Sequence, residues 1–95
     1  MKLLPNTFTQ GGFDFKVIKR DGQVAMLEKS KNGYHNSMFE VVIIQKHKAK
    51  VLFGNTLEDR EAMPPDEAWG QFGWTPESRE RAEAIYADLV AHQNA

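Results

Sequence analysis

The residue types that most often do chemistry in small proteins are few and scattered in this chain. Serines stand at positions 30, 37 and 78, histidines at positions 35, 47 and 92, and cysteine is absent. A serine nucleophile needs a histidine base that an acid orients, and only His35 lies close in sequence to a serine, within a polar loop. A zinc site needs closely spaced histidines or cysteines. We therefore predict no enzymatic activity, no metal site and no cofactor.

A group of carboxylates precedes a segment rich in aromatic rings. The acids are Glu58, Asp59, Glu61, Asp66 and Glu67, and the rings are Trp69, Phe72 and Trp74. Paired carboxylates act as acid and base where burial or repulsion separates their pKa values, whereas this run is typical of a solvated loop. Negative charge beside exposed rings suits the basic groove of a partner, so we predict a partner-binding surface here. The alternative is that the rings latch the loop between the last strand and the helix.

A second candidate surface is basic. It consists of Lys29, Lys31, Tyr34 and His35 on one loop and Lys46, His47, Lys48 and Lys50 on another. Lysines with an interleaved aromatic ring are typical of a single-strand groove, which makes nucleic-acid binding the alternative function. Lysines at strand ends also prevent pairing with other chains, and the sequence pI of about 6.3 is low for a dedicated nucleic-acid binder.

The charges divide along the chain although the net charge is only −1. Residues 1–50 hold nine Lys and Arg against four acids, and residues 51–95 hold three Arg against nine acids. Either the two halves neutralise each other in the fold, or each presents a face of one sign that steers a partner.

The positions of these residues depend on the elements that carry them. A chain of 95 residues forms one domain, and we expect a loose arm over residues 1–12 and one α+β domain over residues 13–95. Alternation from Phe13 predicts a hairpin with Asp21-Gly22 as its two-residue turn. This register places Phe13, Phe15, Val17, Val24 and Met26 on one face. A second hairpin is predicted from Met38–Lys46 and Lys50–Gly54, which gives a four-stranded antiparallel sheet.

The C-terminal segment has the pattern of an amphipathic helix. Ala82, Ile85, Tyr86 and Leu89 recur at helical spacing, so we expect this helix to cover one face of the sheet. Thr75 is the predicted N-cap with Pro76 at the first helical position, and the helix should run to about His92. Between sheet and helix, Pro65 to Gly70 suits a single helical turn. No apolar run is longer than four residues, as in Val41 to Ile44, so no membrane span is expected and we predict a cytoplasmic protein.

Four features follow one another over roughly residues 36–90: Phe39–His47, Pro64-Pro65, Trp69–Thr75 and the following helix. In these features the chain resembles a group of small phage-encoded and prophage-encoded proteins of unassigned function. The resemblance implies a phage accessory role, because small phage proteins often bind a host machine, including defence complexes. It supplies no catalytic residues. We therefore expect a non-enzymatic interaction protein that binds a host protein complex, with inhibition of a host defence nuclease as one such role.

Overall fold

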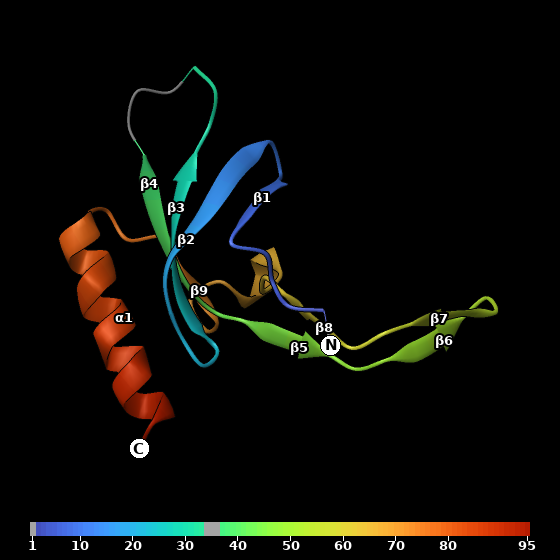
Figure 1. Ribbon diagram of the computed structural model, residues 1–95. Helices are drawn as coiled ribbons and strands as arrows, with labels where there is room; N and C mark the ends of the chain where they lie inside the picture. Colours follow the sequence, from blue (N-terminus) through green and yellow to red (C-terminus); the bar gives the residue numbers. More distant parts are fainter. Residues whose placement is uncertain (1, 34–36) are drawn as a thin grey trace.

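The protein is an α+β domain in which one helix covers a five-stranded antiparallel sheet (Figure 1). The computed structural model describes residues 2–33 and 37–95. The sheet has the order β1-β2-β3-β4-β9, from Thr7–Gln10, Phe13–Asp21, Val24–Ser30, Met38–Ile43 and Gly73–Trp74. The helix α1 spans Arg79–Gln93. The predicted fold class is confirmed, with five strands in the main sheet instead of four.

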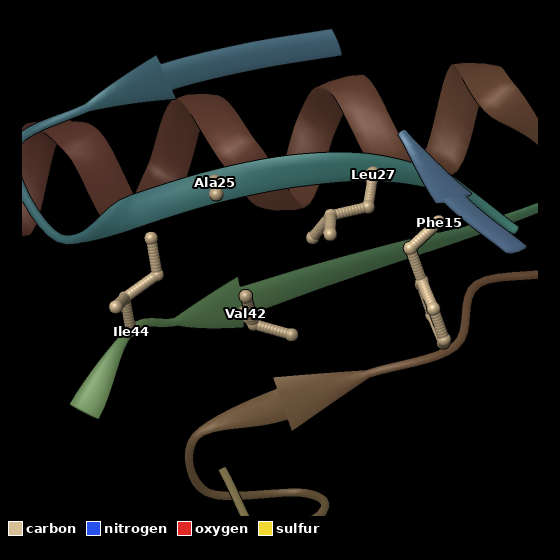
Figure 2. Packing of buried hydrophobic residues seen from close by; sticks show 5 residues of the cluster. All are labelled: Phe15, Ala25, Leu27, Val42 and Ile44. Atoms are coloured by element: carbon tan, nitrogen blue, oxygen red, sulfur yellow. The ribbon is translucent and has the colours of Figure 1, made fainter. Parts of the chain in front are cut away.

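Two clusters of apolar side chains lie on the two faces of the sheet, because successive strand residues point to opposite sides. On β3, Ala25 and Leu27 join Phe15, Val42 and Ile44 in the cluster that Figure 2 shows. The other two buried residues of β3, Val24 and Met26, form the second cluster with Val41 and with Ala82 of the helix. The central strands β3 and β4 are therefore covered on both faces.

The predicted turn of the first hairpin is wrong by one residue. Asp21 pairs with Val24, so Gly22 and Gln23 form the loop, and Gly22 has φ +60°. The side-chain amide of Gln93 fixes this loop by accepting a hydrogen bond from the Gln23 N–H at 2.8 Å and donating one to the Asp21 carbonyl at 2.9 Å.

This shift changes which side chains share a face, because strand side chains alternate with a period of two. Val17 pairs with Leu27, and an irregularity between Val17 and Lys19 shifts the register further along. The rings of Phe13 and Phe15 and the side chain of Val17 therefore pack with the Ala25 and Leu27 cluster. The prediction that they share a face with Val24 and Met26 was wrong.

The predicted second hairpin does not form. β4 pairs with β9, and the chain between them makes a projecting two-stranded ribbon that we call the arm, residues 45–62 (Figure 1). At its base, β5 (Gln45–His47) pairs with β8 (Arg60–Ala62), and at its tip β6 (Lys50–Leu52) pairs with β7 (Asn55–Leu57). The reversal falls at Phe53-Gly54, whose φ angles are +51° and +79°. Two positive φ angles are those of a type I′ hairpin turn.

The first twelve residues were predicted to be a loose N-terminal segment, and they are not loose. Residues 7–10 form the edge strand β1, which pairs with β2. Nearer the terminus, the Lys2 N–H donates to the Asp59 carbonyl and the Lys2 carbonyl accepts from the Glu61 N–H, both at 2.8 Å. The N-terminal segment is thus attached both to the sheet and to the base of the arm.

The helix begins later than predicted. Ser78 is the N-cap in place of Thr75, and its hydroxyl oxygen accepts from the Arg81 N–H at 3.1 Å. The predicted packing face is confirmed, since Ile85, Tyr86 and Leu89 pack around buried Ala82. The predicted single helical turn is the 3-10 helix η1, Asp66–Ala68.

Replacing Leu89 by Ala should lower the free energy of unfolding by about 2 kcal/mol, the low end for a leucine truncation, because this side chain is only half-buried. The neighbouring exposed residue Asp88 provides the control, since Asp88→Ala should change the free energy of unfolding by less than about 0.5 kcal/mol. Urea denaturation of both variants measures the difference. Equal effects would contradict the assigned packing face.

Candidate functional site

A cavity of about 420 Å³ opens on the face of the sheet that the helix does not cover. Its lining includes Phe13 and Phe15 of β2, Lys29 of β3, Glu40 of β4 and Trp69 after η1. Ligand pockets in proteins commonly occupy 300–1,000 Å³ and combine apolar walls with a few polar groups, and this cavity has both properties.

An ion pair joins the two central strands at this cavity. Lys29 Nζ lies 2.9 Å from Glu40 Oε1, and Glu40 is only 3% exposed. The same ammonium lies 4.2 Å from the centre of the Phe13 ring and 5.7 Å from that of Phe15, which are cation–π distances. A buried ion pair adds little net stability compared with apolar side chains of similar size. Stability alone therefore does not account for this pair, and its position in a cavity indicates a role in binding a ligand.

Trp69 is held in place by the loop that precedes the helix. Its indole N–H donates to Thr75 Oγ1 at 2.9 Å, and its ring packs against the Phe15 cluster. Gly73 must be glycine here, because an added Cβ would lie 2.7 Å from the Trp69 ring. Trp69 is therefore a latch between the sheet and the loop, and it forms a wall of the cavity at the same time.

The predicted acidic and aromatic surface is divided in the structure. Asp66 lines the cavity beside Trp69, with the exposed Glu67 next to it on η1. Half-buried Trp74 belongs to β9, and Phe72 is the residue just before this strand. The Asp59 carboxylate is engaged within the arm, where it accepts a hydrogen bond from the Ala49 N–H.

Glu61 was predicted in a solvated loop, and this was wrong. It lies in β8, is 8% exposed, and accepts two hydrogen bonds from the Arg20 guanidinium, at 2.8 and 2.6 Å. A third reaches it from the Leu4 N–H at 3.0 Å. Of the three predicted acids between positions 58 and 61, Glu58 alone is exposed.

The predicted basic surface also separates. Lys29 and Lys31 lie at the end of β3, and both cations lie over the Phe13 ring. Tyr34 and His35 fall outside the described residues. Lys46, His47, Lys48 and Lys50 are all exposed along the outgoing strand of the arm, at the opposite end of the sheet (Figure 1). The two lysine groups therefore do not form one groove.

The sequence analysis did not identify the roles of two residues, Glu40 in the cavity and Phe53 at the turn of the arm. Glu40 stands inside an apolar strand, and a lone acid in such a run is the signal that could have indicated a buried polar contact. Phe53 was assigned to a strand, although the following Gly54 marked a turn.

Within residues 2–33 and 37–95, no three histidines, acids or cysteines gather in a way that could hold a metal ion. In the same part of the chain, no helix has the length and apolar character needed to cross a membrane.

The hydrogen bonds from Arg20 lower the pKa of Glu61 from 4.5 to about 2, against the opposing effect of burial. A lowered pKa in the folded state contributes stability above about pH 4.5, and this is lost as the pH falls toward 2. At pH 7, Glu61→Gln should therefore lower the free energy of unfolding by about 2–3 kcal/mol, because it leaves Arg20 without its anion.

This difference between Glu61→Gln and the parent should shrink steadily between pH 4.5 and about 2 in urea denaturation. The exposed Glu58 on the same arm is the matched control, and Glu58→Gln should change stability by less than about 0.5 kcal/mol. A Glu61→Gln effect that stays constant across this pH range would show that the ion pair does not carry it.

Comparisons of this chain with protein-family models, curated proteins and solved structures give no match. The geometry of the cavity and of the arm is therefore the basis for a functional proposal.

Proposed function

We propose that this chain is a non-enzymatic interaction protein and that its cavity receives a segment of a partner protein. The observation that carries the proposal is the cavity of about 420 Å³ on the uncovered face of the sheet, with aromatic walls and the Lys29–Glu40 ion pair. Aromatic anchors in concave sites dominate the energetics of protein interfaces.

The groups on the cavity wall favour binding over catalysis. Lys29 and Glu40 are paired with each other, so each already has a partner for its charge. The Thr75 hydroxyl accepts the Trp69 indole N–H, and no histidine of the described residues lines the cavity beside it to act as its base.

The charge on the cavity indicates the chemistry of the partner. The positive charge of Lys29 is compensated by Glu40, whereas Asp66 at the rim adds a negative charge that Glu67 reinforces. A partner segment with a Lys or Arg next to an apolar side chain would complement this arrangement. Together with the resemblance to phage-encoded proteins, this favours a host protein complex as the partner, including a defence nuclease that the protein would inhibit.

The test is affinity capture from host lysate with the tagged protein, before and after nuclease digestion, followed by measurement of the dissociation constant for the captured protein. Capture should survive digestion. Asp66→Lys should weaken binding by about tenfold or more, because it places a like charge against the partner's cation.

The control is Glu77→Lys, which makes the same charge change at an exposed position outside the cavity. This variant should bind as the parent does. Capture that disappears on digestion, or equal binding by Asp66→Lys and Glu77→Lys, would contradict the proposal.

A further inference from the structure

The tip of the arm, residues 48–57, presents apolar side chains to solvent. Its strands β6 and β7 form a two-stranded sheet of their own, and the ribbon extends away from the main sheet and the helix (Figure 1). Phe53 at the turn is 94% exposed and Val51 is 70% exposed. Neither belongs to the two core clusters.

In the part of the chain that the structure describes, neither apolar cluster includes Phe53. Its φ of +51° is a conformation that asparagine and glycine adopt readily and that costs other residues about 1 kcal/mol or more. Burial does not offset this cost, because the ring is exposed. An exposed ring in a strained turn is typical of a contact residue.

The charge at the tip is positive although the chain as a whole is slightly acidic. Residues 48–57 contain Lys48 and Lys50 and no acid. At the base of the arm, the Asp59 and Glu61 carboxylates are bound to the Ala49 N–H and to Arg20. Arg20 therefore compensates the charge of Glu61, whereas Asp59 and the exposed Glu58 carry negative charge just below the tip, and Lys48 and Lys50 are the charged residues of the tip itself.

Shape and charge together favour one ligand. The major groove of B-form DNA is about 12 Å wide and admits a two-stranded β-ribbon. Lysines on such a ribbon neutralise phosphates, and an apolar ring contacts base edges or the thymine methyl group. A membrane is disfavoured, because stable anchoring takes more apolar surface than Val51 and Phe53 provide, the exposed large apolar residues of the tip among the side chains that the structure describes.

We infer that the tip of the arm is a contact for duplex DNA, in which Lys48 and Lys50 neutralise phosphates and Phe53 contacts the bases of the major groove. This site is separate from the cavity and does not depend on the function proposed for it. Two phosphate contacts make a weak auxiliary site, in agreement with the low pI of the chain.

The experiment is a titration of a labelled DNA duplex of about 20 base pairs, followed by fluorescence anisotropy between about 50 and 200 mM salt. A plot of log K against log salt concentration should have a slope of about −2, the value for two neutralised phosphates. Lys48→Gln with Lys50→Gln should abolish most of the binding and flatten this slope. The control, Lys16→Gln with Arg81→Gln, removes the same charge from exposed positions elsewhere and should keep the slope.

Phe53→Asn separates a structural role from a contact role. Asparagine suits the positive φ, so the variant should melt no lower than the parent, yet it should bind DNA about fivefold or more weakly with an unchanged slope.

Three results would overturn the inference. One is no binding of the duplex at about 50 mM salt with protein near 1 mM, far above the usual range for non-specific sites. Another is equal or tighter binding to the single strand, and the third is binding to phosphatidylserine vesicles but not to the duplex.

Discussion

Burial of β3 and β4 on both faces is the constraint on which the rest of the structure depends. Val24 to Leu27 are all buried, so each face of this strand pair needs its own cover. The helix supplies one cover through Ala82 and its neighbours. The other face is covered by Phe8 and Phe15, whose rings stack with centroids 5.1 Å apart, and by Trp69 from the loop before the helix.

The second cover is less complete than the first, and the cavity results from this difference. A helix presents a continuous apolar stripe, whereas the cover on this face comes from separate segments, which are β1, β2 and the loop before the helix, and leaves space between them. Lys29 and Glu40 fill part of that space where the sheet would otherwise expose apolar strand. Their mutual pairing lets two charged groups lie in an otherwise apolar face.

Sequence reasoning located the elements that local patterns define. The spacing from Ala82 to Leu89 identified the packing face of the helix, and the alternation from Phe13 identified β2. It failed where a turn was ambiguous. Asp21-Gly22 and Gly22-Gln23 both use the glycine, and the contact with Gln93, which decides between them, joins residues about seventy positions apart.

The candidate site was less predictable than the fold. Asp66 and Trp69 were identified as neighbours of a partner surface, but Glu40 reaches them only through the pairing of β4 with β9. That pairing involves a two-residue strand with no alternation to detect. The burial of Glu61 depends on Arg20, forty-one positions away, and no local pattern indicates it.

The arm leaves the sheet after β4 and returns before β9, two strands that pair with each other. Its base is fixed by the Arg20–Glu61 ion pair and by Lys2, so the sheet does not depend on the ten residues at the tip. Changing the length of such a segment costs little chain entropy, since each doubling of a flexible loop costs only about 0.6 kcal/mol. The tip is thus the part of this protein that evolution or an engineer can replace as a cassette, giving the same scaffold a new specificity.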